Sequence, residues 1–221
     1  MVTRFCQLIL LFLPICAFAN DWVLECPEHI SNAGRCAAHK EQLLIKKYPS
    51  LVSRAGDILQ ISTKKGNQVE LENKSWHYYA IGYIEQANIL LVRTQYWEGN
   101  SHLVVDTENG YKKEIYGFPT FNKDYTQFVT TDYDLEAGYN PNILGIYKKY
   151  ASWRLEYFIS PDSWGSDSPV WIDDNNLAFT RISAPQLLEY KRQKYMLTKR
   201  NGNWWLRPFN KQLQTDAAPL N

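Results

Sequence analysis

The sequence predicts an all-β protein built from antiparallel four-stranded units and preceded by one short helix. Three observations lead to this prediction: hairpin patterns recur along the chain, a single segment has helical spacing, and aromatic residues make up 14% of the sequence. Aromatic side chains fit the pleated, half-buried surface of a sheet. Because the hairpins recur at regular spacing, we expect a propeller-like arrangement, with a β-sandwich of the same strands as the alternative.

The predicted hairpins turn at Gly66, Gly110 and Gly202, and each glycine has an asparagine beside it. Asn and Gly tolerate the positive φ that both central residues of a type I′ turn require. The turn glycines are 44 and 92 residues apart, close to one and two units of about 45 residues. A fourth hairpin is expected to turn at about residues 149–152, without an Asn-Gly pair. The strand pairs that flank these turns are residues 58–61 with 69–71, 103–105 with 111–115, 195–197 with 204–206, and 143–147 with 153–158.

A second recurrent element precedes the later hairpins. It consists of a proline, an aromatic residue two positions on, an acidic turn and a strand centred on phenylalanine, and it occurs in residues 118–130 and 168–180. Together with the hairpins it gives four strands in each unit of roughly 40–50 residues, as in propeller blades. Over about residues 75–209 the pattern resembles the blades of TolB-like and WD40-like propellers, which implies sheets arranged around an axis. The chain supplies about three full units and one leading hairpin.

The predicted helix covers residues 31–48. Its apolar residues recur near helical spacing, Ser31 or Asn32 can cap its start, and Pro49 ends it.

The N-terminus has the three-part order of a cleavable secretory signal. Arg4 supplies positive charge, an apolar stretch runs over residues 5–15, and Ala17 and Ala19 are the small residues before a cut after Ala19. The mature chain is therefore expected to be secreted or periplasmic, without a transmembrane segment, because no second long apolar run follows. A loose lipobox ending at Cys16 leaves lipidation open as an alternative.

These signals divide the chain into four predicted parts. They are a signal peptide (1–19), a disulfide-tethered helical segment (20–56), a β-repeat domain (57–210) and a flexible C-terminal tail (211–221).

Two cysteines, Cys26 and Cys36, remain after signal removal. An even pair in an oxidising compartment favours a disulfide. The alternative is a zinc site in which His29 and His39 join the two cysteines, at spacings that metal sites also use. The disulfide is preferred because thiolates oxidise in that compartment, and we expect no metal.

Charge and motifs exclude several function classes. The 24 Lys and Arg balance the 23 Asp and Glu, so the basic footprint of a nucleic-acid-binding protein is missing. The chain has no G-x-S-x-G motif and no Gly-rich phosphate loop. The acidic run Asp132, Asp134 and Glu136 departs from an EF-hand, which needs glycine at its sixth position. We therefore expect no cofactor, and whether the chain is an enzyme stays open, with a non-catalytic role favoured.

The candidate binding surface is the segment between residues 160 and 176. It is rich in turn-forming residues, loops carry function more often than strands, and tryptophan is enriched at binding hot spots. The alternative is a long connection whose tryptophans cover the core, and a carboxylate pair for glycoside hydrolysis is a third interpretation. The candidate residues are Trp164, Trp171, Asp162, Asp167, Asp173 and Asp174.

These features predict an exported binding protein whose partner is another protein, contacted by loops and tryptophans at one end of the β-units. An inhibitor- or immunity-type protein that acts on another exported protein would suit this size and charge. The first alternative is a carbohydrate-binding module or glycan-active enzyme, whose exposed aromatic side chains would stack on sugars. The second is a structural component of the cell envelope.

Overall fold

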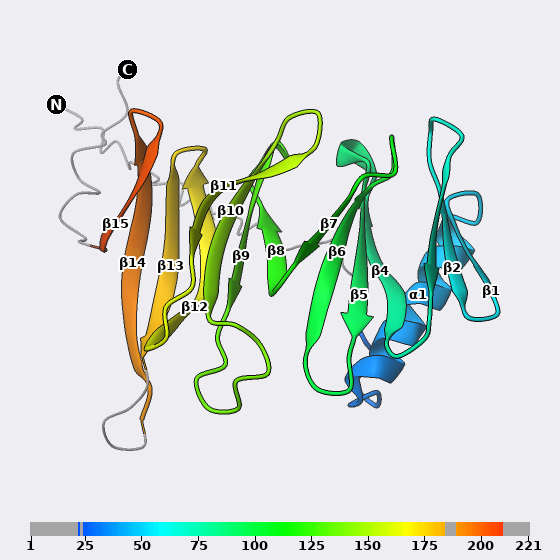
Figure 1. The fold of residues 1–221 in the computed structure, drawn as a ribbon, viewed down its shortest axis with the longest axis horizontal. Coiled ribbons are helices and arrows are strands. Elements are labelled where there is room, and N and C mark those ends of the chain that lie inside the picture. The colour runs from blue at the N-terminus through cyan, green and yellow to red at the C-terminus, as the bar shows by residue number, and fades with distance from the viewer. Residues whose placement is uncertain (1–21, 23, 184–188, 210–221) are drawn as a thin grey trace, which may run out of the picture.

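The computed structural model describes residues 22, 24–183 and 189–209. The predicted signal peptide, Cys16 and the predicted tail 211–221 lie outside these residues. The described chain contains one α-helix and fifteen strands in four antiparallel sheets (Figure 1). The prediction of an all-β fold with one short helix is confirmed.

Each sheet is a meander in which consecutive strands pair. The first consists of β1 (Val52–Ala55), β2 (Ile58–Ser62) and β3 (Gln68–Glu72). The second consists of β4 (His77–Ile84), β5 (Ile89–Gln95), β6 (Asn100–Asp106) and β7 (Lys112–Ile115). The third consists of β8 (Phe118–Phe121), β9 (Gln127–Asp132), β10 (Ile143–Lys149) and β11 (Trp153–Ile159). The fourth consists of β12 (Trp164–Asp173), β13 (Asn176–Ser183), β14 (Lys191–Arg200) and β15 (Asn203–Pro208).

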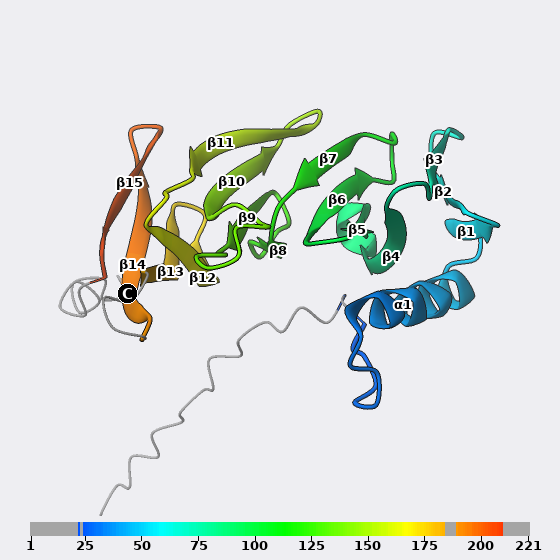
Figure 2. The same cartoon turned by 60° about the horizontal axis from the view of Figure 1, so that its bottom comes forward.

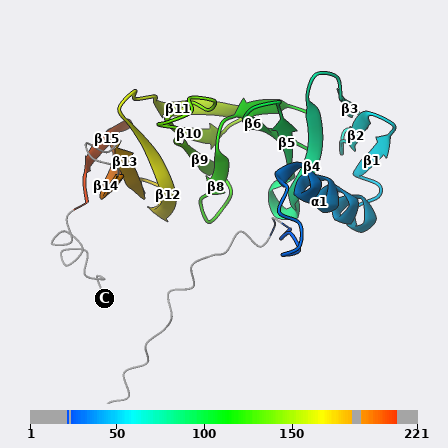
Figure 3. The same cartoon turned by 90° about the horizontal axis from the view of Figure 1, so that it is seen from below.

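The four sheets stand in an open row, with the first and the fourth at opposite ends (Figure 1). Seen from below, the row bends (Figure 3). β4, β8 and β12 lie along one side of it, and β7 and β11 along the other (Figure 2). The three full units and the shorter leading unit expected from the sequence are therefore present, but they form a row rather than a ring. β1 falls within the segment 20–56 that was assigned to the helix.

The predicted hairpins are β2–β3, β6–β7, β10–β11 and β14–β15. The type I′ prediction is correct only for the last of these, where Asn201 and Gly202 have φ values of 49° and 82°. At the other Asn-Gly turns only the glycine has positive φ. These two loops, residues 63–67 and 107–111, are longer than a two-residue hairpin turn. In them the Gly66 N–H donates to the Thr63 carbonyl, and the Gly110 N–H donates to the Asp106 carbonyl.

Hydrophobic cores lie between successive sheets. Leu59 and Leu90 belong to the core between the first and second sheets, Phe128 and Trp153 to the next, and Leu197 to the one between the third and fourth. A sheet covered on both faces needs apolar residues on both sides of its strands. β5 accordingly has a continuous buried run, whereas β3 in the first sheet alternates between buried and exposed residues.

Helix α1 (Ala33–Lys47) packs on β4 and β1 (Figure 2). The side chain of Asn32 caps it by accepting a hydrogen bond from the Arg35 N–H at 2.9 Å. Cys26 and Cys36 lie at disulfide distance, with their Cα atoms 5.7 Å apart, and so tether the start of the helix. Because the two cysteines pair with each other, they do not supply the thiolate ligands that the zinc alternative needs.

A buried ion pair fastens α1 to the sheets. Glu41 on the helix is 5% exposed, and its Oε1 lies 2.5 Å from Nε of Arg54 on β1. The second carboxylate oxygen accepts from the Ala80 N–H of β4 at 3.1 Å, and Arg54 also donates to the Tyr78 carbonyl at 2.6 Å. Because the Glu41 carboxylate and the Arg54 guanidinium each have further hydrogen-bond partners, the ion pair can be accommodated at low exposure.

Within the described residues, α1 is too short and too polar to cross a bilayer.

Candidate functional site

The two predicted binding tryptophans contribute to the core between the third and fourth sheets. Trp164 is 7% exposed and stacks on Phe179 at 6.4 Å between ring centroids. Trp171 is half-buried, and its indole N–H donates to the Thr120 carbonyl at 2.9 Å. Their segment is strand β12 rather than a loop, because a register shift between Asp167 and Val170 accommodates the turn-forming residues there.

The four predicted aspartates are spread along β12 rather than gathered. Asp162 is exposed before the strand, and Asp173, eleven residues further along the chain, ends it. Asp167 lies 3.4 Å from Arg192. Asp173 accepts from the Asn175 N–H at 2.8 Å, and Asp174 accepts from the side chain of Asn122 at 3.0 Å. The structure gives these carboxylates local contacts and does not bring them together.

Exposed and half-buried aromatic side chains gather instead at one end of the sheets, where the turns β5–β6 and β9–β10 lie (the lower end in Figure 1). We call this region the aromatic loop surface. Its members are Trp76, Tyr96, Trp97, Tyr133, Tyr139 and Tyr190.

Trp97 is the most exposed member of the aromatic loop surface. It lies in the turn β5–β6 and is 96% exposed, while Tyr139 in the next loop is 57% exposed. The two loops touch: a Cβ added to Gly99 would meet the side chains of Asn140 and Tyr139 at 2.7 and 3.6 Å. Only glycine, at its φ of +81°, allows so close an approach. Two neighbouring sheets therefore present their aromatic residues side by side.

Asp134 holds the β9–β10 loop in shape. Its carboxylate accepts from the backbone N–H groups of Ala137, Tyr139 and Asn140 at 2.9, 2.7 and 3.2 Å. Burial opposes the charged form, but these backbone donors outweigh it and lower the pKa of Asp134. Asn140 links the loop onward, because it accepts from the Asn100 N–H at 3.4 Å and donates to Asp132 at 3.1 Å. The acidic run in this loop is thus a scaffold that positions Tyr139.

The remaining aromatic residues are anchored by hydrogen bonds. The Tyr96 hydroxyl donates to Glu114 at 2.7 Å, and burial together with this carboxylate raises the pKa of Tyr96 to about 12. The Trp76 ring lies edge-on to Tyr96 at 6.0 Å. Tyr190 donates to Glu136 and meets Tyr133 at 6.5 Å, which extends the surface to the fourth sheet.

The loops and strand ends around these aromatic residues are acidic. The acidic residues are Glu98, Asp132, Asp134, Glu136, Asp162 and Glu189. The nearby basic residues are Lys74, which is already paired with Glu72 at 2.9 Å, and Lys191 and Arg192 at the start of β14. An electron-rich ring beside a carboxylate attracts cations, because the ring face and the carboxylate both carry negative charge.

Sequence analysis did not single out Trp97 and Tyr139. A usable signal was present: both lie in turns close to glycine, in Tyr96–Gly99 and Gly138–Asn140. Aromatic residues in a strand are explained by the core, whereas aromatic residues in a turn are not.

Within the described residues, no group of His, Cys, Asp and Glu side chains is arranged to hold a metal ion. A scan against protein-family models finds no matching family, and a search of curated proteins finds no match. The resemblance to propeller blades therefore stays a prediction.

Proposed function

We propose that this chain is an exported binding protein that contacts another protein through the aromatic loop surface. The exposure of Trp97 on a loop that is hydrogen-bonded in place carries the proposal. Tryptophan and tyrosine dominate binding hot spots, because they bury a large area at little cost in conformational entropy. A rigid loop lowers that cost further.

The surface also supports a choice of partner chemistry. Its aromatic residues come from three successive sheets, which gives an extended contact of the kind a folded protein makes. The acidic loops favour a partner whose contact surface carries lysine or arginine. A secretory signal, the tethered cysteine pair and this surface together fit an inhibitor- or immunity-type protein that acts on another exported protein.

The test is a pull-down from the exported fraction with oxidised protein from Asn20 onward, as wild type and as the double variant Trp97→Ser, Tyr139→Ser. Tyr150→Ser is the matched control, because Tyr150 is 54% exposed in the β10–β11 turn at the opposite end. We expect one stoichiometric protein with wild type and control, and its loss with the double variant. Equal retention by all three would refute the proposal.

A glycan ligand is the second candidate, favoured by the flat exposed ring of Trp97 beside the amide and carboxylate groups of the β9–β10 loop. It predicts a shift of tryptophan fluorescence on titration with glycans, abolished by Trp97→Ser. A flat response across a broad panel would exclude it.

A further inference from the structure

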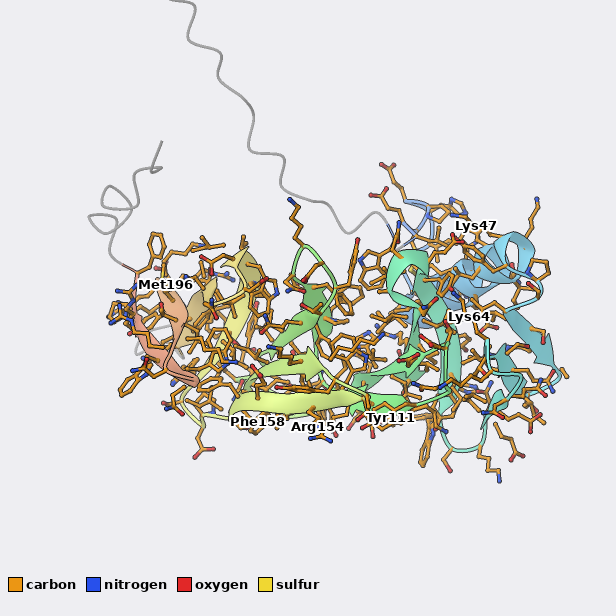
Figure 4. All side chains as sticks on the ribbon, turned by 90° about the horizontal axis from the view of Figure 1, so that it is seen from above. Lys47, Lys64, Tyr111, Arg154, Phe158 and Met196 are labelled. Carbon is orange, nitrogen blue, oxygen red and sulfur yellow. A yellow bond between two sulfur atoms is a disulfide. The ribbon has the colours of Figure 1, made fainter. Side chains whose placement is uncertain are left out.

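The fourth sheet has an outer face that no other described sheet covers. Side chains opposite each other in register lie on the same face of a sheet. Leu177, Leu197 and Leu206 are in register and face the third sheet. The neighbouring rows must point the other way, away from the rest of the molecule. Figure 4 shows Met196, a member of such a row, at one extremity of the row of sheets.

This outer face carries an apolar residue on each of its four strands. One row joins Val170, Ala178, Met196 and Arg207, and the adjacent row ends at Trp205. Val170 is 59% exposed and Trp205 is 61% exposed. A contiguous exposed apolar patch on a protein surface marks an interaction site more often than scattered apolar residues do.

The margin of the face is basic. Arg192, Lys194, Arg200 and Arg207 lie on it. Of the two acids on this face, Asp167 is in contact with Arg192 at 3.4 Å, and Asp173 accepts from the side chain of Asn176 at 2.9 Å. Trp205, Arg200 and Arg207 line a hollow of about 500 Å³ together with Thr198 and Asn203. The hollow therefore combines one large aromatic side chain with two guanidinium groups.

The guanidinium of Arg207 is held in place on the sheet. Its Nη2 atom lies 3.3 Å from the Met196 sulfur and 3.4 Å from the Thr198 hydroxyl. Arginine carries five N–H donors, and the described residues engage donors on this one nitrogen of Arg207. A fixed guanidinium with unused donors matches the two oxygens of a carboxylate.

We propose that the outer face of the fourth sheet binds an acidic segment of a partner protein, in which an aspartate or glutamate carboxylate meets Arg200 and Arg207 and an apolar side chain packs on Trp205. Charge complementarity selects this occupant. A second copy would bring two basic margins together, which like-charge repulsion opposes. The site is separate from the aromatic loop surface and of opposite charge, so it does not rest on the function proposed above.

The experiment measures fluorescence anisotropy of two labelled peptides with the full mature chain. One peptide alternates aspartate and leucine, and the other has asparagine in place of aspartate. The variants are Arg200→Gln with Arg207→Gln, and Trp205→Ser. The matched control is Lys64→Gln with Lys65→Gln, which removes two exposed charges from a turn of the first sheet. All substitutions are at the surface, and equal thermal midpoints verify the fold.

We expect the aspartate peptide to bind and the asparagine peptide to bind at least about tenfold more weakly, as the loss of charge-assisted hydrogen bonds implies. The arginine double variant should lose about tenfold in affinity, and the lysine control should lose none. The variant Trp97→Ser, Tyr139→Ser should bind the peptide like wild type, which separates this site from the aromatic loop surface.

Three results would overturn the proposal. The first is equal or absent binding of the two peptides. The second is a concentration-dependent dimer that Trp205→Ser abolishes, since a second copy would then be the occupant. The third is stronger peptide binding after truncation at Phe209, since the last residues of this chain would then be the occupant.

Discussion

The two end sheets of the row terminate the molecule in different ways. The outer face of the first sheet is polar: the Ser53 hydroxyl donates to Gln60 at 3.4 Å, and Gln60 donates to Glu70 at 3.1 Å. The outer face of the fourth sheet instead exposes Val170 and Trp205. Both sheets bury one face against a neighbour, so burial alone does not distinguish them. The first end therefore presents hydrogen-bonded polar side chains at its outer face, whereas the fourth end presents exposed apolar side chains.

The largest expected effect tests whether both ends belong to one cooperative fold. Leu59 in the first sheet and Leu197 in the fourth are both fully buried. We expect Leu59→Ala and Leu197→Ala each to lower the free energy of unfolding by about 3–4 kcal/mol, through lost burial and the cavity left behind. Urea denaturation measures both. A cost well under about 1 kcal/mol for Leu197→Ala would mean that the fourth sheet unfolds separately.

The next effect concerns the helix that supports the first end. Glu41→Ala should destabilise the protein by about 3 kcal/mol, because it leaves the Arg54 guanidinium without its carboxylate at a part-buried position. Denaturation at neutral pH measures it, with Glu70→Ala on the exposed outer face as the control, expected to cost at most about 0.5 kcal/mol. Equal costs would show that α1 is not fastened by this ion pair.

A third prediction concerns a buried histidine in the second sheet, which lies between the two ends of the row. His102 on β6 is 4% exposed, and burial, assisted by the charge of Arg93, lowers its pKa from 6.5 to about 4. Between these pH values the unfolded chain binds more protons than the folded one, so stability falls as the pH falls from about 6.5 toward 4. The full loss amounts to about 3 kcal/mol.

The measurement is urea denaturation between pH 7 and pH 4 for wild type and His102→Gln. The variant should show a shallower decline, because only the remaining titratable groups then contribute. Parallel curves would contradict the assignment. The described strands of the two end sheets contain no histidine, so acid should weaken the middle of the row first.

The smallest expected effect sharpens the comparison of outer faces. Trp205→Ser should change the free energy of unfolding by no more than about 0.5 kcal/mol, because the ring is mostly exposed. It should nevertheless reduce binding of a hydrophobic fluorescent dye, whereas Gln60→Ser on the first sheet should leave dye binding unchanged. Unchanged dye binding by Trp205→Ser would show that the apolar face is already covered.

Much of the fold follows from local sequence signals. The hairpin at Asn201–Gly202 and the helix cap at Asn32 depend on residues close together in the chain, and both were predicted. The site was not. Trp164 and Trp171 lie in a strand whose bulge at Ser168, with φ of 52°, could not be read from the turn-forming residues around it.

The sequence also did not reveal that the sheets form an open row rather than a ring. Whether sheets form a ring depends on how their faces pack, and those contacts join residues far apart in the chain. Trp97 and Tyr139 likewise come from different sheets, and only the packing of their loops brings them together.

The pairing of each strand with its sequence neighbours has a consequence for how the chain acquires its structure. None of the described strands has to wait for a distant partner, so closing each hairpin costs little chain entropy, and such local topologies form quickly. A chain that emerges N-terminus first can form the first sheet, complete the packing of α1 once β4 follows, and then add each later sheet to the one before. In this order the fourth sheet is the last of the described layers to form.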